Sequence, residues 1–318
     1  MSITSFLALV QFRTKITSIL PCLFGSLYAL YAFDTFNLYH AVIMCFSVLL
    51  FDMTRSALST YINYKNNLKK EELDAHNVMT RYQLNPKLVK YIIGIMFIVA
   101  SLLGLYLTYL THMTLFFLGI LCFTIGILYS LAPSPIPHLP LGELLIGITL
   151  GLILTFMSIY IHAFDTDLLL LQIRQGQLLL RYNPHALMDI VIVCIPFMIT
   201  ISNIVLASNL CDIDEETSSK SYTLPSYIGK EKSLMLWEMS YYAVYIIILA
   251  LILTKHLPWI CLATLITFIP VKYHIDHFKL KQVKSETFGN VIQNYFFIGM
   301  SLILTLGLDV FVSRHLFK

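Results

Sequence analysis

Charged residues are scarce in this sequence. Asp, Glu, Lys and Arg make up 12% of its 318 residues, about half of what a soluble domain usually carries. Hydrophobic residues make up 58% and the mean hydropathy is +0.76, so the composition predicts an integral membrane protein. The formal net charge of +3 is too small to indicate a nucleic-acid partner.

Other features are missing as well. No C-x-x-C pair occurs and the six cysteines are scattered, which argues against a disulfide framework and against a zinc site. No linker or low-complexity segment divides the chain, so we expect a single domain over residues 1–318. No cleavable signal peptide is evident, because the first apolar run is long enough to remain as a membrane helix.

Long apolar segments are what the sequence has instead. A helix that crosses a membrane needs roughly 20 mostly apolar residues. We therefore predict an all-α integral membrane protein, a bundle of about nine transmembrane helices around a central cavity open to the cytoplasmic side. The nine segments are 16–33, 38–62, 88–110, 113–131, 141–163, 187–210, 233–253, 257–273 and 289–313.

Basic residues are divided unevenly between the two sets of loops, and this predicts the orientation. With the N-terminus inside, fifteen Lys and Arg residues fall on inner segments and five on outer ones. We expect a multi-pass protein of the cell membrane with a cytoplasmic N-terminus and an external C-terminus. The outer residues are Arg174, Arg181, Lys255, Arg314 and Lys318.

Acidic residues gather where the apolar segment 187–210 meets water. Asp212 and Glu216 are four positions apart and Asn209 is three positions before Asp212, so the three share one helical face. With nothing basic beside them in the sequence, their oxygen atoms form a candidate Mg²⁺ site. A solvated acidic helix end is the alternative interpretation.

The same residues, followed by Thr223 and Leu224, resemble the second aspartate-rich motif of the UbiA superfamily of intramembrane prenyltransferases. Three further segments resemble the branch of that superfamily that acts on dihydroxynaphthoate. They are Phe12-Arg13-Thr14-Lys15 with Pro21 and Gly25, then Tyr129, Pro133 and Pro135 with Pro140-Leu141-Gly142-Glu143, and finally Lys284-Ser285-Glu286-Thr287-Phe288 with Asn294. The resemblance spans nearly the whole chain.

The resemblance implies an enzyme of the lipid bilayer with Mg²⁺ as cofactor. Its implied reaction transfers a polyprenyl chain from polyprenyl diphosphate to 1,4-dihydroxy-2-naphthoate. The leaving diphosphate needs stabilisation by a metal ion and by basic side chains. On this basis the catalytic residues are Asp212, Glu216, Lys65 and Lys69, the metal ligands are Asn209, Asp212 and Glu216, and the substrate-binding residues are Asn63, Arg13, Lys15, Tyr129, Glu143 and Lys220.

The first aspartate-rich motif departs from the family pattern. Asn63 and Lys69 stand where the branch has aspartates, while Tyr61, Tyr64 and Lys65 keep the register. Asn63 retains a neutral oxygen, and the ammonium group of Lys69 could take the place of a metal ion beside the diphosphate. A catalytically impaired paralogue that binds a prenyl lipid or a quinone is therefore the alternative function.

Several candidate residues have a second interpretation. Lys65 and Lys69 also fit the positive-inside pattern alone. Glu143 either contacts the substrate or stabilises the start of the fifth helix, where a negative charge is favourable. Tyr28 and Phe123 either line a groove for the prenyl chain or face lipid and core.

Overall fold

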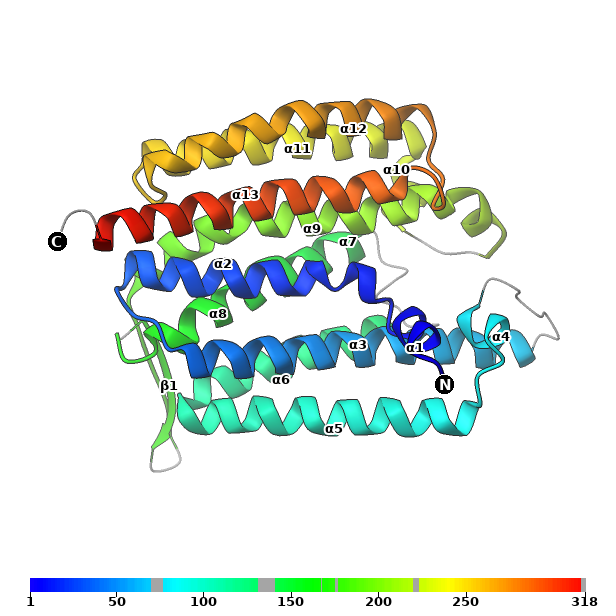
Figure 1. Ribbon diagram of the computed structural model, residues 1–318, viewed down its shortest axis with the longest axis horizontal. Helices are drawn as coiled ribbons and strands as arrows, with labels where there is room; N and C mark the ends of the chain where they lie inside the picture. Colours follow the sequence, from blue (N-terminus) through cyan, green and yellow to red (C-terminus); the bar gives the residue numbers. More distant parts are fainter. Residues whose placement is uncertain (70–76, 131–140, 167, 175–176, 220–222, 316–318) are drawn as a thin grey trace.

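The computed structural model describes residues 1–69, 77–130, 141–166, 168–174, 177–219 and 223–315 (Figure 1). At residues 13, 67–69, 129–130, 172–174, 178, 214–219 and 315 it describes the backbone alone.

Long helices build most of the molecule, and every predicted apolar segment lies on one of them. They are α2 (Ile16–Ala32), α3 (Leu38–Lys69), α5 (Pro86–Leu110), α6 (Met113–Ser130), the continuous column of α7 (Gly142–Ile146), η2 (Gly147–Ile153) and α8 (Leu154–Ala163), α9 (Pro184–Ser219), α11 (Lys230–Leu253), η3 (Trp259–Thr267) with α12 (Phe268–Leu280), and α13 (Phe288–His315). Because α3 and α9 continue past the predicted ends at 62 and 210, both motif segments are helical.

Six helices within the described residues are long and apolar enough to cross a membrane. Two more, Ile16–Ala32 and Met113–Leu128, are apolar but shorter. The count of nine crossings therefore stays a prediction. The six are Leu38–Asn66, Pro86–Leu110, Gly142–Ala163, Pro184–Ile213, Lys230–Leu253 and Phe288–Arg314.

Short elements lie at the two ends of the bundle (Figure 1). The end that holds the N-terminus carries α1 (Ile3–Leu9), η1 (Phe12–Thr14), α4 (Val78–Arg81) and α10 (Leu224–Ile228). We name it the motif end, because α3 and α9 bring both predicted motifs there. The opposite end carries an antiparallel hairpin of β1 (Leu169–Arg174) and β2 (Gln177–Tyr182). This hairpin corrects the prediction of a purely helical chain.

Local sequence explains how the helices after the first motif begin. Asn85 accepts a hydrogen bond from the Lys87 backbone at 2.9 Å, and Pro86 takes the first position of α5, where its missing N–H group is not needed. Asn77 caps α4 in the same way. Its amide group also donates to the Thr60 carbonyl oxygen at 3.3 Å, which ties α4 to α3.

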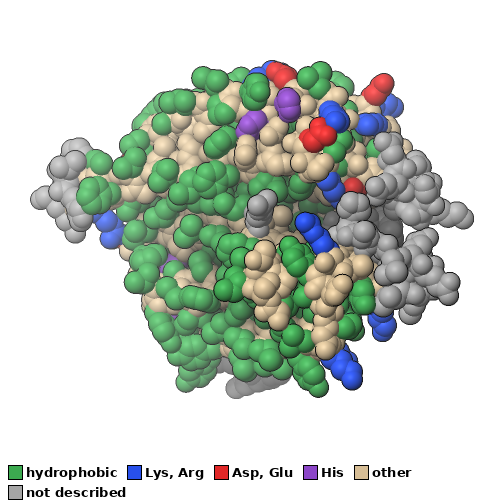
Figure 2. All heavy atoms as spheres, turned by 45° about the vertical axis from the view of Figure 1, so that its right-hand side comes forward, with side chains coloured by type: hydrophobic (Ala, Val, Ile, Leu, Met, Phe, Trp, Pro, Cys, Tyr) green, Lys and Arg blue, Asp and Glu red, His purple; other side chains and the backbone are tan. Residues whose placement is uncertain are grey.

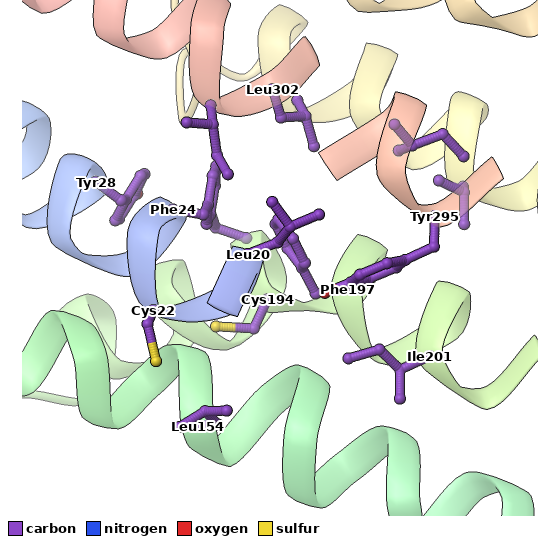
Figure 3. Packing of buried hydrophobic residues seen from close by; sticks show 14 of the residues in the cluster. Leu20, Cys22, Phe24, Tyr28, Leu154, Cys194, Phe197, Ile201, Tyr295 and Leu302 are labelled. Carbon is purple, nitrogen blue, oxygen red and sulfur yellow. The ribbon is translucent and has the colours of Figure 1, made fainter. Parts of the chain in front are cut away.

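Close helix packing holds the bundle together. At Gly151 of η2, an added Cβ atom would lie 2.4 Å from the Cα atom of Met198 on α9, so only glycine fits there. Phe24 of α2, Phe197 of α9 and Tyr295 of α13 meet in the core (Figure 3), where the rings of Phe24 and Phe197 are 4.8 Å apart. This core fixes α2, α9 and α13 around the interior of the bundle.

The surface divides by polarity along the bundle. Figure 2 shows hydrophobic side chains over much of the visible face, while most of the visible charged side chains gather toward the motif end. A charged side chain in the centre of a bilayer costs at least about 2.5 kcal/mol. Chemistry that needs charge is therefore expected at the motif end.

Candidate active site

A carboxylate at the motif end joins three helices. Glu143 lies in the first turn of α7 and is 4% exposed. Its Oε1 atom accepts a hydrogen bond from Asn209 Nδ2 at 2.7 Å and another from the Leu224 backbone N–H at 3.2 Å. Asn209 thus presents its NH₂ group to Glu143 and turns its own oxygen elsewhere. Glu143 thereby orients the first residue of the acidic motif.

These contacts add a role for Glu143 that we did not predict from the sequence. Its place in the first turn of α7 fits the interpretation in which a negative charge stabilises the helix start. The bond to Asn209 crosses 66 positions of sequence. Glu143 and Asn209 both lie in segments that resemble the same family. This was the only indication in the sequence that the two residues would be close.

A lysine lies against Asp212, one helical turn beyond Asn209. The Lys284 ammonium group contacts the Asp212 carboxylate, although the residues are 72 positions apart. This corrects the expectation that nothing basic lies beside the acidic motif. The side chains of Asp212 and Lys284 are 28% and 53% exposed. Since an exposed pair of this kind contributes little to stability, both charges are available to a ligand.

The loop before α13 holds Lys284 in place. Thr287 Oγ1 accepts a hydrogen bond from the Val283 backbone at 3.1 Å and donates to the Lys281 carbonyl oxygen at 2.8 Å. Lys281 also forms an ion pair with Glu286 at 2.7 Å. Lys284 is a candidate functional residue that our site prediction omitted. The signal was available, because a basic residue stood inside a segment shared with the family.

The altered first motif reaches the same end on α3. Asn63 and Lys65 are both exposed. They are two positions apart and so point roughly 200° apart around the helix. Among the described side chains, no hydrogen bond or ion pair joins Asn63 to Asn209 or Asp212. The first motif therefore stands at the motif end without a direct link to the second.

Five predicted site residues have no described side chain. Arg13, Lys69, Tyr129 and Glu216 are placed by backbone alone, in η1, α3, α6 and α9 respectively. Lys220 lies outside the described residues. The backbone of α9 is helical up to Ser219, which keeps Glu216 one turn beyond Asp212.

Lys15, just before α2 begins, is buried against α3. Its ammonium group lies 3.2 Å from Asp52 Oδ1 and donates to Ser56 Oγ at 2.6 Å. Asp52 also accepts hydrogen bonds from Arg55 Nη2 and from Ser18 Oγ, each at 3.0 Å. Burial lowers the pKa of Lys15 to about 8, while the Asp52 carboxylate acts in the opposite direction. We expected Lys15 to bind substrate, and the structure instead places it in a contact between α2 and α3.

A central cavity of about 250 Å³ adjoins this cluster. Asp52 and Arg55 are the charged side chains among its described lining residues. Ser208 lines it as well, so the second motif begins at the cavity wall. Most of the remaining wall is apolar and comes from α3, η2, α8 and α9, with Val48, Phe51, Leu150, Leu154, Met157 and Ile201 among its residues.

A second cavity, of about 320 Å³, lies between α3, α5 and α6. It adjoins the central cavity, because Val48 and Met157 line both. Its lining is largely apolar and includes Phe123, which fits the groove interpretation of that residue. Tyr28 packs in the core instead, 6.0 Å from Phe24 between ring centroids (Figure 3).

The arrangement suits a ligand with a charged head and a long apolar tail. Lys284, Asp212 and Asn209 offer charge and oxygen ligands at the motif end. The two adjoining cavities offer largely apolar walls. Polar groups at one end and apolar walls beyond them are the usual composition of a site that orients an amphiphilic substrate.

Comparison with known proteins confirms the family resemblance. Residues 18–298 match the model of the UbiA prenyltransferase family. The 1,4-dihydroxy-2-naphthoate octaprenyltransferase of Bacillus subtilis (strain 168) is 26% identical over 250 residues, which are 78% of this chain and 74% of that protein.

Solved structures of UbiA homologues share the fold. The apo structure of the homologue from Aeropyrum pernix K1 has a TM-score of 0.66 at 17% identity and covers 90% of this chain and 97% of its own. The homologue from Archaeoglobus fulgidus bound to DMAPP and Mg²⁺ has a TM-score of 0.62 at 11% identity, covering 97% and 99%. Together with the six apolar helices, the family match shows that this chain is a multi-pass membrane protein and belongs to the UbiA prenyltransferase family.

Proposed function

We propose that this protein transfers a polyprenyl chain from polyprenyl diphosphate to 1,4-dihydroxy-2-naphthoate, a step of menaquinone biosynthesis. The main support for the proposal is the position of two charged side chains relative to two apolar cavities. Asp212 and Lys284 lie at the motif end, and two adjoining, largely apolar cavities lie beyond them. The Bacillus subtilis relative, named for that acceptor, supports its choice.

In this proposal the motif end holds the diphosphate. The basic residues proposed to bind it are Lys284, Lys65, Lys69, Arg13 and Lys220. Their charge stabilises the leaving group as the bond between oxygen and the allylic carbon breaks and its electron pair stays on the diphosphate.

The acceptor supplies the other half of the reaction. A ring carbon donates an electron pair to the allylic cation, and the new carbon–carbon bond forms. In the net step the carboxylate leaves as carbon dioxide, and its bonding pair returns to the ring. Water must be kept from the cation, and the apolar walls that include Leu154 and Met157 serve this purpose. Tyr129 is proposed as a substrate contact, and Glu143 acts by orienting Asn209.

The residues present fit a Mg²⁺ ion. Asn209 keeps its amide oxygen available because its nitrogen binds Glu143, and Asp212 offers a carboxylate. Such hard oxygen atoms are the ligands that Mg²⁺ prefers. We propose that Asn209, Asp212 and Glu216 hold the ion, which neutralises charge on the diphosphate when bound. Among the described side chains no group of three His, Cys, Asp or Glu could hold a metal, so Glu216 and the diphosphate itself would complete the coordination.

The proposed orientation places the motif end in the cytoplasm. We propose nine membrane crossings in a single domain over 1–318, with a cytoplasmic N-terminus and an external C-terminus. The excess of basic residues on the inner segments supports this orientation. The N-terminus and the last residues of α13 lie at opposite ends of the bundle in Figure 1, as an odd number of crossings requires.

The altered first motif favours a second candidate function. Asn63 and Lys69 replace carboxylates that would hold a metal ion. A protein that lost this half of the site could keep the scaffold and bind a prenyl lipid or a quinone without converting it.

One experiment separates the two candidates. The purified protein in nanodiscs is given Mg²⁺, a polyprenyl diphosphate and 1,4-dihydroxy-2-naphthoate, and the products are followed by mass spectrometry. A prenylated naphthoquinol that disappears when EDTA is added supports the enzyme. Tight binding of the lipid diphosphate without product supports the binding protein.

A further inference from the structure

The charges at the central cavity are not balanced. Lys15 and Arg55 provide two positive charges around the single negative charge of Asp52. Among the described residues that line the cavity, Asp52 and Arg55 are the only charged ones. A partly buried excess charge beside apolar walls is unfavourable unless a partner neutralises it. The cluster therefore has the charge of a site for an anion.

Arg55 is the residue that presents this charge to the cavity. The Lys15 side chain is 1% exposed and does not line the cavity, whereas the Arg55 side chain is 24% exposed and does. Arg55 donates to Asp52 Oδ1 from Nε at 3.2 Å and from Nη2 at 3.0 Å. These two bonds hold the plane of the guanidinium group and leave its Nη1 donors for a ligand.

Next to Arg55 the cavity has a flat aromatic wall. Phe51 lies one turn earlier on α3, and its ring stacks on Phe123 of α6 with centroids 3.8 Å apart. Gly126 makes room for the Phe51 ring, since a Cβ atom there would lie 3.0 Å from that ring. A planar apolar ring with one anionic substituent matches this combination, with its ring against Phe51 and its anion on Arg55.

The position of Arg55 along α3 separates it from the diphosphate. Arg55 precedes Asn63 by eight positions, which is roughly 12 Å along a helix axis. Asn63, Asp212 and Lys284 belong to the motif end, whereas Arg55 lines the central cavity that begins beside the second motif at Ser208. A diphosphate held at the motif end and an anion held on Arg55 would thus be neighbours in one site, and we assign the anion on Arg55 to the second substrate.

We propose that Arg55 binds the carboxylate of the aromatic acceptor and selects for acceptors that carry one, with Asp52 as the residue that positions it. This inference rests on the proposed function and goes beyond it, because it assigns acceptor specificity to a cluster outside both aspartate-rich motifs. A guanidinium group can bind a carboxylate through two parallel hydrogen bonds, which fixes the plane of the acceptor as well as its charge.

Binding measurements on the full chain in nanodiscs test the assignment. The probes are 1,4-dihydroxy-2-naphthoate, 1,4-naphthalenediol, which lacks the carboxylate, and a polyprenyl diphosphate with Mg²⁺. In Arg55→Met we expect roughly 10- to 100-fold weaker binding of the naphthoate, as for a lost charge-assisted hydrogen bond. Binding of the other two probes should change less than about 2-fold. Arg55→Lys should fall between, because an ammonium group keeps the charge but not the planar pair of donors.

Lys90→Gln is the matched control. Lys90 shares a neighbouring pocket with Arg55 but does not line the central cavity, so its loss removes nearby positive charge without removing the proposed contact. The naphthoate affinity of this variant should equal that of the wild type.

Four results would overturn the assignment, and each has a different consequence for the proposed function. Equal weakening of naphthoate and naphthalenediol binding in Arg55→Lys, which retains the charge and the fold, would make Arg55 a purely structural residue. Weaker diphosphate binding alone would move Arg55 to the other substrate. If the wild type forms prenylated naphthoquinol while Arg55→Met keeps the wild-type KM for naphthoate, the inference fails and the proposed function stands. A wild type that neither binds nor converts the naphthoate would contradict both.

Discussion

The side-chain nitrogen of Asn209 donates a 2.7 Å hydrogen bond to Glu143 and so joins the start of α7 to the acidic motif on α9. The same Glu143 oxygen accepts the backbone N–H of Leu224 at the start of α10. One buried carboxylate thus leaves the side-chain oxygen of Asn209, and not its nitrogen, free to face a ligand. The arrangement of side chains at the motif end therefore depends on Glu143 as well as on the residues of the acidic motif.

Removing this carboxylate should damage both stability and activity. In Glu143→Ala, the Asn209 amide and the Leu224 N–H lose an acceptor at a buried site, at about 1–3 kcal/mol for each group. We expect a lower unfolding temperature in detergent and at least a roughly 10-fold lower kcat/KM. Glu231→Ala, an exposed first-turn carboxylate on α11, is the control and should behave as wild type. Unchanged activity in Glu143→Ala would mean that Asn209 needs no such support.

Lys284 should matter far more than its neighbour Lys281. If Lys284 binds the diphosphate, Lys284→Gln should lower kcat/KM by about 100-fold, the usual loss when a group that stabilises developing charge is removed. Lys281 is paired with Glu286 in the same loop, so Lys281→Gln should have little effect. Steady-state kinetics with varied polyprenyl diphosphate provide the measurement. Similar kinetics for the two variants would remove Lys284 from the site.

The buried Lys15 should give the protein an unusual dependence of stability on pH. Its pKa is about 8 in the folded state, against 10.5 for an ordinary lysine. Between these values the unfolded chain binds a proton that the folded chain has released, so this group makes the folded state more stable as the pH rises. The unfolding temperature of wild type, relative to Lys15→Met, should therefore increase from pH 7 to pH 9.5. A difference that stays constant or falls would contradict the lowered pKa.

Labelling from the two sides of the membrane tests the orientation. Lys87 lies beside the N-cap of α5 at the motif end, and Lys255 follows α11 at the other end. A cysteine introduced at Lys87 should react with an impermeant reagent only from the cytoplasm, and one at Lys255 only from outside. Reaction of both from the same side would refute the proposed arrangement of crossings.

The positions of the long helices could be predicted from the sequence, because a bilayer imposes a minimum apolar length on each. Their ends could not, since α3 and α9 keep their hydrogen bonds well beyond the apolar run. The hairpin of Leu169–Arg174 and Gln177–Tyr182 was missed for another reason. Its apolar residues lack strict alternation, and a short apolar run of that kind does not distinguish a strand from a helix.

The residues of the site could be predicted better than their contacts. The resemblance identified Asn209, Asp212 and Glu143, but their partners lie 66 and 72 positions away. A single sequence has no periodicity that reports contacts at such separations. The pair of Asp52 and Arg55 was different, because a spacing of three on one helix brings side chains together and could have been recognised.

The central claim is that the motif end ionises a polyprenyl diphosphate with the help of Mg²⁺ held at the second motif. Release of pyrophosphate in nanodiscs, measured against Mg²⁺ concentration in the presence of 1,4-dihydroxy-2-naphthoate, tests it most directly. Wild type should release one pyrophosphate for each prenylated naphthoquinol, with a Hill coefficient for Mg²⁺ of about one, because Asn63 and Lys69 replace the other set of carboxylates. Asp212→Ala should be at least about 100-fold slower. Asp276→Ala, which removes an exposed carboxylate on α12 that pairs with Lys272, should keep the wild-type rate. Equal rates in wild type and Asp212→Ala, or no release by wild type at any Mg²⁺ concentration, would contradict the claim.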